Sequence, residues 1–178
     1  MQLKLSSEFD SNSSFGGELA LGKRKSRRPV STKRAMHTVL RSNYSGLRKF
    51  RRPLASLLEK EIGRWGMKLY KASINSNHIH LCTKAAHPDD YKNFLRTFSA
   101  LSARLVTGAR KGRALAKKFW AVSPFSRIVA WGRAMDTVLN YIGKNQLEAA
   151  GQIAYRPRDK RRAGKGPPRP PSRPFVDG

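Results

Sequence analysis

The stretch Met67–Thr83, with the sequence MKLYKASINSNHIHLCT, contains the local pattern that decides the fold. Residues 67–74 and residues 78–83 each have the length and composition of a β-strand. Residues 75–77 (NSN) favour a turn because their short polar side chains hydrogen-bond nearby backbone groups. The stretch is therefore predicted to form a β-hairpin in which residues 78–83 are the returning strand.

Two further elements are predicted before the hairpin. Residues 35–41 (AMHTVLR) have a strand-like composition. Pro53 suits the first turn of a helix, and apolar residues then recur at helical spacing until Gly66 breaks the pattern. These apolar residues are Leu54, Leu58, Ile62 and Trp65.

Three elements are predicted after the hairpin. A long helix should begin near Pro88 and end at Gly108. Its apolar residues form one continuous stripe, which consists of Tyr91, Phe94, Leu95, Phe98, Leu101 and Leu105. Residues 119–131 (FWAVSPFSRIVAW) are strand-like on both sides of their proline and should form one strand or two short ones. A last helix should occupy residues 133–150 and end at Gly151.

The predicted order, β-α-β-β-α-β-α, indicates an α+β fold in which helices pack against a mainly antiparallel sheet. We expect one domain over residues 34–153. Residues 1–33 are expected to form a disordered basic tail, and residues 154–178 a disordered tail rich in Arg and Pro. Neither tail contains enough apolar area to offset the entropy of ordering.

The chain is strongly basic, because 37 Lys and Arg against 11 Asp and Glu give it a formal net charge of +26. More than half of this excess lies within residues 34–153. Basic side chains gain affinity by displacing counterions from phosphates, so the composition indicates a nucleic-acid partner. An anionic membrane surface is the competing interpretation, but neither a basic amphipathic anchor helix nor an apolar run of transmembrane length stands out.

The compartment is constrained by what the sequence omits. The first residues lack the apolar stretch of a secretory signal, so the cytoplasm is expected. Cys82 is the single cysteine, which excludes an intrachain disulfide and a thiolate zinc site.

The first candidate site is the His78-Ile79-His80 segment. Side chains alternate along a strand, so the two imidazoles should project from one face. Two imidazoles and one oxygen donor would leave open positions for phosphate oxygens around Mg²⁺ or Mn²⁺. Such a motif on a strand is more often a half-exposed pair than a metal site, so the motif alone is weak.

The second candidate site is Tyr141 with Asn145, which share a helix face at i and i+4. Both lie about 90° from the centre of the apolar stripe, at the edge of the buried face. That stripe consists of Met135, Val138, Leu139 and Ile142. A phenol with an ordinary pKa of about 10 is a poor nucleophile, and a metal that polarises the attacked phosphate would be needed. A boundary tyrosine in contact with water is the alternative.

Other chemically interesting residues favour structural roles. Asp136 suits the first turn of the last helix, where an acid faces the helix dipole. His37 and His87 lack partners at metal-ligand spacing, and Cys82 is expected to be a small buried filler beside the histidines. Three of the four aromatic residues of the 119–131 segment are expected in the core, with base stacking as the alternative. They are Trp120, Phe125 and Trp131.

Read together, the two sites resemble the HUH single-tyrosine transposases, and within them the REP-associated tyrosine transposases. The resemblance depends on two segments, Ser76–Leu81 (SNHIHL) and Leu139–Gln146 (LNYIGKNQ), the second of which resembles the family's Y-I-x-x-N-P helix. It covers about residues 34–153. Gln146 replaces the proline that relatives often have at this position.

The resemblance implies a ferredoxin-like sheet with packed helices and a specific chemistry. His78, His80 and Asn145 would bind Mg²⁺ or Mn²⁺. Tyr141 would attack a phosphodiester of single-stranded or hairpin DNA, leaving a 5′-phosphotyrosine and a free 3′-hydroxyl. The enzyme would act as a monomer or a homodimer, and in dimeric relatives the tyrosine helix can serve the partner's site.

Two rival interpretations stay open at this stage. A non-catalytic or domesticated nucleic-acid-binding protein would have the same charge, but it gives no reason for the paired histidines or for Tyr141 and Asn145. A replication-initiation or relaxase-like HUH nuclease usually has a larger chain or a second tyrosine in the same helix. Here Lys144 occupies the position where such a tyrosine could lie.

Overall fold

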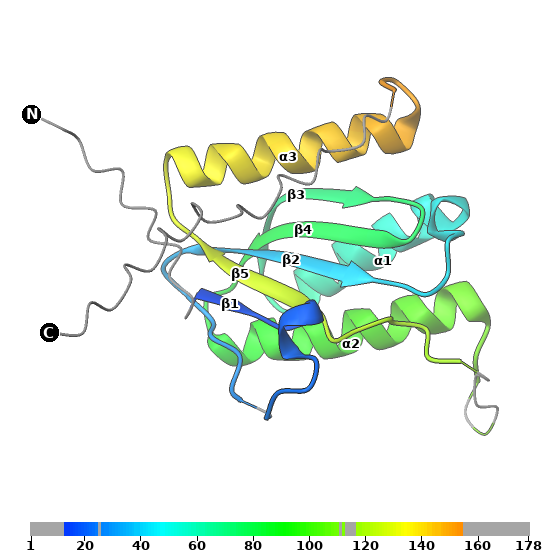
Figure 1. Ribbon diagram of the computed structural model, residues 1–178, viewed down its shortest axis with the longest axis horizontal. Coiled ribbons are helices and arrows are strands. Elements are labelled where there is room, and N and C mark those ends of the chain that lie inside the picture. The colour runs from blue at the N-terminus through cyan, green and yellow to red at the C-terminus, as the bar shows by residue number, and fades with distance from the viewer. Residues whose placement is uncertain (1–12, 25, 111, 113–116, 155–178) are drawn as a thin grey trace, which may run out of the picture.

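The computed structural model describes residues 13–24, 26–110, 112 and 117–154 (Figure 1). Within these residues, three α-helices pack against a five-stranded antiparallel sheet whose strand order is β1-β5-β2-β4-β3. The strands are β1 (Ser14–Phe15), β2 (Ala35–Arg41), β3 (Lys68–Ile74), β4 (His78–Lys84) and β5 (Phe125–Val129). The helices are α1 (Arg51–Arg64), α2 (Pro88–Thr107) and α3 (Arg133–Ala150), with the short 3-10 helices η2 (Gly17–Ala20) and η3 (Leu47–Phe50). The predicted α+β fold is confirmed.

The predicted hairpin is present and forms one half of the sheet. Strands β3 and β4 pair along their length, and the turn closes where the Asn75 amide donates a hydrogen bond to the His78 carbonyl at 2.9 Å. Strand β4 also pairs with β2, so it lies inside the sheet. Its backbone is fixed by neighbours on both sides, which makes it a rigid support for its side chains.

Side chains of β4 alternate between two separate cores. Ile79 and Leu81 belong to the larger core, which they share with residues of α1 and α2. Cys82 belongs to a smaller core beneath α3, which contains Met135, Val138 and Ile142. The histidines of β4 therefore face α3, because His78, His80 and Cys82 follow each other at the two-residue period of a strand.

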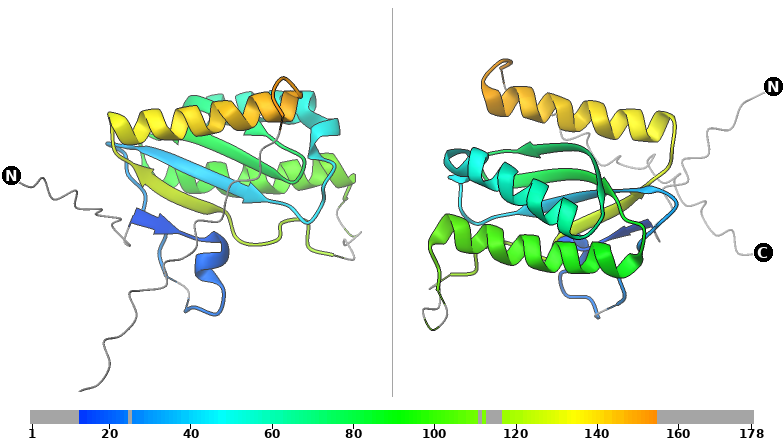
Figure 2. Two further views of the ribbon diagram at one scale, coloured as in Figure 1. Left: turned by 45° about the horizontal axis from the view of Figure 1, so that its top comes forward. Right: turned by 180° about the vertical axis from the view of Figure 1, so that it is seen from behind.

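The helices cover the sheet unequally. Figures 1 and 2 show α1 and α2 together on one face and α3 alone on the other. Helix α3 makes most of its sheet contacts with β3 and fewer with β4 and β5. One α-helix cannot cover a five-stranded sheet. On this face of the sheet, α3 therefore covers β3 more fully than it covers β2 and β5.

The N-terminal region corrects one prediction. Residues 13–24 and 26–33 were expected to belong to a disordered tail, but β1 adds a strand next to β5, and Arg28 donates hydrogen bonds to the Ser126 hydroxyl and the Pro124 carbonyl. The Arg28 guanidinium also lies 4.7 Å from the centre of the Phe15 ring. Two residues are too short a strand to be recognised from composition. Residues 1–12, 25 and 155–178, which include nearly all of the predicted C-terminal tail, lie outside the described part of the chain.

The 119–131 segment forms one strand rather than two. Only Phe125–Val129 is a strand, and Trp120 contributes a single bridge to Ser42. The helix predictions are confirmed, since α2 buries Tyr91, Phe94, Leu95 and Phe98, and α3 covers the predicted residues. None of the described helices has the length and apolar character needed to cross a membrane.

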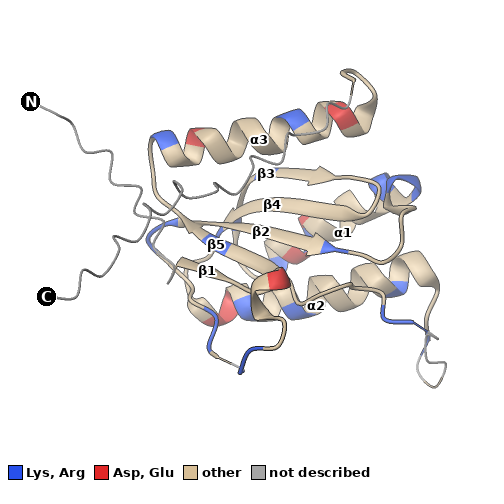
Figure 3. Cartoon of the chain, in the orientation of Figure 1, with Lys and Arg blue, Asp and Glu red and all other residues tan. Residues whose placement is uncertain are grey.

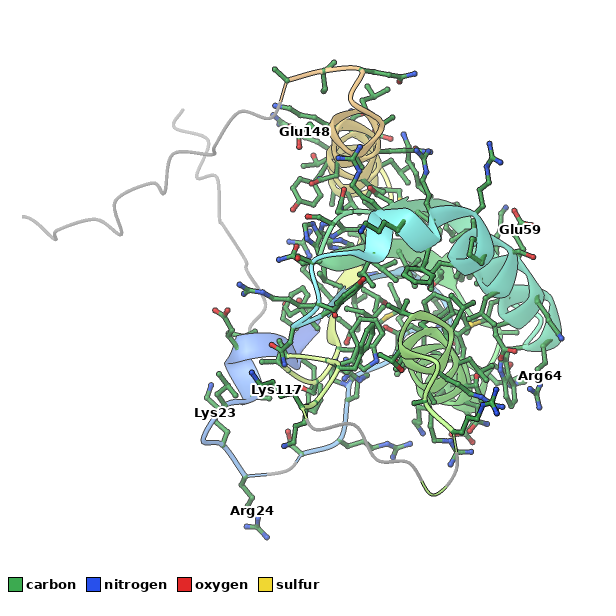
Figure 4. The ribbon with its side chains drawn as sticks, turned by 90° about the vertical axis from the view of Figure 1, so that its right-hand side faces the viewer. Lys23, Arg24, Glu59, Arg64, Lys117 and Glu148 are labelled. Atoms are coloured by element: carbon green, nitrogen blue, oxygen red, sulfur yellow. The ribbon has the colours of Figure 1, made fainter. Side chains whose placement is uncertain are left out.

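Basic residues are spread over the outside of the fold rather than gathered on one element. In Figure 3 they mark all three α-helices and the connections between elements, and acidic residues are fewer. Figure 4 shows Lys23, Arg24 and Arg64 at the periphery, pointing away from the core. Several faces could therefore contact a polyanion.

Candidate active site

The two histidines of β4 lie together on the face of the sheet that α3 covers. The His78 and His80 ring centroids are 4.7 Å apart, with an angle of 84° between the ring planes. His80 is 4% exposed, whereas His78 is half-buried. The predicted pairing of the imidazoles on one face is confirmed, and the pair lies at the edge of the buried region rather than in open solvent.

Helix α3 brings Tyr141 to the same place. The Tyr141 ring meets the His80 ring edge to face, with centroids 5.1 Å apart and ring planes 86° apart. Tyr141 is half-buried, as expected for a residue at the margin of the apolar stripe. The phenol and both imidazoles therefore come together within one chain, although they lie on elements far apart in the sequence.

His78 is held by the two asparagines of the hairpin turn. Its Nδ1 donates to the Asn77 Oδ1 at 2.7 Å, and its Nε2 lies 3.0 Å from the Asn75 Nδ2. Asn75 is 8% exposed, and its Oδ1 accepts a hydrogen bond from the Ser73 hydroxyl. The sequence predicted these asparagines only as turn residues, yet they also fix the orientation and the proton position of the imidazole.

His80 has a neighbour that the sequence analysis did not assign to the site. His37, on β2, places its Nε2 3.4 Å from the His80 Nδ1, and its ring lies 6.1 Å from the Tyr141 ring, centroid to centroid. His37 is 7% exposed. The sequence pattern predicted the strand that carries His37, but not which strand would pair with which, so the contact with His80 could not be found.

Burial, with a smaller contribution from the nearby Arg127 guanidinium, lowers the pKa of His37 to about 4. The ring is therefore neutral at pH 7, with one nitrogen that donates and one that accepts. Arg127 pairs with His37 across β2 and β5, so its guanidinium is on the same face of the sheet.

Asn145 lies one helical turn after Tyr141 and is 7% exposed. Its Nδ2 donates to the Tyr141 carbonyl at 2.7 Å. This hydrogen bond fixes the side-chain amide, so Oδ1 is the atom of Asn145 that could bind a cation. Asn145 lies on α3 one turn after Tyr141, as the sequence predicted, and its role as a metal ligand stays a prediction.

The donor chemistry of the site fits a hard divalent cation. In His80 the Nδ1 contacts His37, so Nε2 is the nitrogen that would bind the metal. In His78 the Nδ1 is held by Asn77 and the Nε2 by the Asn75 amide, so the Asn75 Nδ2 would have to move away before the His78 Nε2 could bind a cation. The predicted set is two imidazoles and one amide oxygen. Within the described residues, no group of three or more His, Cys, Asp or Glu side chains is placed to hold a metal.

Most of the residues predicted to be structural are so. Cys82 is fully buried against the Met135 sulfur at 3.7 Å, and burial raises the pKa of its thiol to about 11. Asp136 lies in the first turn of α3, and His87 caps α2. One aromatic prediction is wrong, because Trp131 is 48% exposed and its indole donates to the Lys33 carbonyl.

Comparison with known proteins identifies the family to which the chain belongs. The model of the IS200-like transposase family matches residues 30–145. No curated protein matches the chain significantly. A solved REP-associated tyrosine transposase bound to a REP hairpin has a similar fold, with a TM-score of 0.58 and 12% identity over 74% of this chain and 76% of that one.

A candidate transposase from Deinococcus radiodurans R1 also matches, with a TM-score of 0.45 and 18% identity over 70% of this chain and 98% of that one. The family match includes the histidine strand and the tyrosine helix through Asn145. The observed fold and the convergence of these two elements agree with it. The chain belongs to the IS200-like transposase family.

Proposed function

We propose that this transposase cuts single-stranded DNA with Tyr141 as the nucleophile and joins the cut end to another strand. The observation that carries this proposal is the contact between the Tyr141 and His80 rings within one chain. A tyrosine placed beside two metal-binding imidazoles is what phosphodiester attack by a phenol requires.

The bond changes are as follows. The Tyr141 oxygen forms a bond to phosphorus, and the bond between phosphorus and the 3′ oxygen breaks. The phenolic proton passes to solvent, and the leaving 3′ oxygen takes up a proton. The products are a 5′-phosphotyrosine and a free 3′-hydroxyl. The same steps in reverse, with another 3′-hydroxyl, join two strands.

His78, His80 and Asn145 would hold Mg²⁺ or Mn²⁺ in this site. The bound cation would polarise the attacked phosphate and neutralise the charge that develops on it. The residues of the chain supply the geometry: β4 fixes the imidazoles, α3 fixes Tyr141, and Asn75 with Asn77 keeps the His78 ring in one orientation.

The substrate should be single-stranded DNA next to a hairpin. The solved relative is a REP-associated transposase bound to a REP hairpin. The net charge of +26 and the basic residues on several faces of this chain suit contact with both strands of such a hairpin (Figure 3). We expect the enzyme to act in the cytoplasm, as a monomer or a homodimer.

The test is a suicide substrate, a single-stranded oligonucleotide whose cleavage releases a short fragment and leaves the rest on the protein. With Mn²⁺ or Mg²⁺, wild type should form a covalent adduct linked through a 5′-phosphate, and EDTA should prevent it. Tyr141→Phe should form none. Tyr70→Phe is a matched control, since Tyr70 lies beneath the same helix but its ring packs against Trp131.

An adduct with Tyr141→Phe equal to that of wild type would show that the nucleophile is misassigned. Salt-sensitive DNA binding without cleavage in any divalent ion would instead identify a binding protein that keeps the transposase fold.

A further inference from the structure

His37 is a buried titratable residue beside the proposed site, and the proposed chemistry gives it no role. It lies on β2, across from β4, and contacts both His80 and Tyr141. We propose that His37 is a positioning residue, which accepts a hydrogen bond from the His80 Nδ1 and so directs the His80 Nε2 to the metal. This inference rests on the proposed function, in which His80 is a metal ligand.

The geometry of the two rings supports a nitrogen-to-nitrogen hydrogen bond. The His37 and His80 ring planes are inclined by only 20°, with centroids 5.6 Å apart. The 3.4 Å between His37 Nε2 and His80 Nδ1 is at the long end of hydrogen-bond distances. The rings are thus joined nearly edge to edge through these nitrogens rather than stacked in close face-to-face contact.

The direction of the hydrogen bond follows from the chemistry of a ligand. A neutral imidazole carries one proton, and a nitrogen that binds a metal must offer its lone pair. If His80 binds through Nε2, its proton is on Nδ1 and must point to an acceptor. The His37 Nε2 is the acceptor at that position. Metal-binding histidines usually donate their second nitrogen in this way.

Because both rings are buried, the position of the His80 ring proton determines which nitrogen of His80 can bind a metal. His37 and His80 are 7% and 4% exposed, so water has little access to replace either partner. The contact of Tyr141 with both rings adds a second consequence. If His80 turned about its side-chain bonds, its contact with the nucleophile would change together with its metal-binding nitrogen.

The first test measures the His80 tautomer in the metal-free protein by long-range ¹H–¹⁵N correlation spectra of the histidine rings. The chain has only 4 histidines, so each ring can be assigned from single variants. Wild type should carry the His80 proton on Nδ1. His37→Gln keeps an acceptor and should preserve this tautomer, whereas His37→Leu removes the acceptor and should shift the proton toward Nε2.

His87→Gln is the matched control, because His87 caps α2 away from the site and its loss should leave the His80 signals unchanged. A wild-type His80 with its proton on Nε2 would overturn the inference, as would an unchanged tautomer in His37→Leu. If His37→Leu does not fold, wild type and His37→Gln still decide the tautomer.

The second test measures Mn²⁺ affinity by electron paramagnetic resonance of the free ion. His37→Leu should bind about 10–100-fold more weakly than wild type, and His37→Gln should recover most of the loss. Equal affinity in wild type and His37→Leu would overturn the inference. If wild type binds no Mn²⁺, the proposed metal role of His80 fails, while the tautomer experiment still reports on the His37 hydrogen bond.

Discussion

The Tyr141 and His80 rings meet edge to face, with centroids 5.1 Å apart, and both belong to the same chain. Helix α3 packs over β3 and β4 of its own sheet, and its apolar residues Val138 and Ile142 are buried there. In the one chain described, Tyr141 and the imidazoles thus lie together, and this arrangement predicts that one protomer contains a complete site. Exchange of α3 between protomers would replace this packing by the same contacts made between two chains.

The first prediction concerns this cis arrangement. Tyr141→Phe and His80→Ala should each abolish adduct formation, and a mixture of the two variants should remain inactive because neither chain contains a complete site. The measurement is adduct yield on a suicide oligonucleotide at several mixing ratios. Restored activity in the mixture, up to about a quarter of wild type for random pairing, would show that the tyrosine helix is exchanged in a dimer.

The second prediction concerns Asn145. Asn145→Asp keeps an oxygen donor and adds a charge, so Mn²⁺ binding should be retained or strengthened. Asn145→Leu has no donor and should bind Mn²⁺ at least about 10-fold more weakly. Isothermal titration with Mn²⁺ gives both affinities.

Both Asn145 variants lose the hydrogen bond from Nδ2 to the Tyr141 carbonyl. That loss should lower the free energy of unfolding by about 1 kcal/mol in each. The comparison between them therefore removes the effect of the lost hydrogen bond and reports on the oxygen donor with its charge, and equal Mn²⁺ affinities would exclude Asn145 as a ligand.

The third prediction is a pH dependence of stability caused by His37. Its pKa is about 4 in the folded protein and 6.5 ordinarily, so between these values the unfolded chain binds a proton that the folded chain does not. This contribution to stability is complete above pH 6.5 and is lost as the pH falls toward 4. It amounts to about 2–3 kcal/mol.

Urea unfolding at pH 7.5 and pH 4.5 measures the effect. Wild type should lose more stability between these values than His37→Gln, which has no titrating group at this position. Other groups titrate in both proteins, so the difference between the two losses reports on His37. Identical losses would contradict the depressed pKa.

The fourth prediction concerns the N-terminal strand. Gly16 has a φ of 82°, and a Cβ there would collide with the Pro124 carbonyl oxygen next to β5. Gly16→Ala should lower the free energy of unfolding by more than about 1 kcal/mol, since it adds a steric clash to a strained backbone. Gly22→Ala is the matched control, because Gly22 has a φ of 68° but open space around its Cβ position.

Urea unfolding of both variants separates the cost of the backbone angle, which they share, from the cost of the clash. If Gly16→Ala is no less stable than Gly22→Ala, the N-terminal segment does not pack against β5 in solution as described.

Local sequence patterns were sufficient to predict the three α-helices, the longer strands and part of the proposed site. Alternation placed His78 and His80 on one face of a strand, and the i, i+4 spacing placed Tyr141 and Asn145 on one face of a helix. Both depend only on the period of a single element, which is why they could be predicted. The short strand β1 could not be predicted, because two residues are too few to show the alternation of side chains that identifies a strand.

His37 shows what local patterns cannot provide. Its strand was predicted, but its contact with His80 depends on β2 pairing with β4 in one register, which is a property of the assembled sheet. The same holds for the exposed Trp131, whose strand-like segment ends before it and leaves the indole to pack at the surface.

By itself, the sequence determined the three α-helices, the strands β2 to β5, the basic charge and the residues that are proposed to bind a cation or attack a phosphate. Only the tertiary structure decided that Tyr141 meets His80 in the same chain, that His37 contacts His80, and that Asn75 and Asn77 contact His78. The physical reason is that periodicity is a local property of one segment, whereas the distance between two segments depends on strand order, register and the face on which a helix packs.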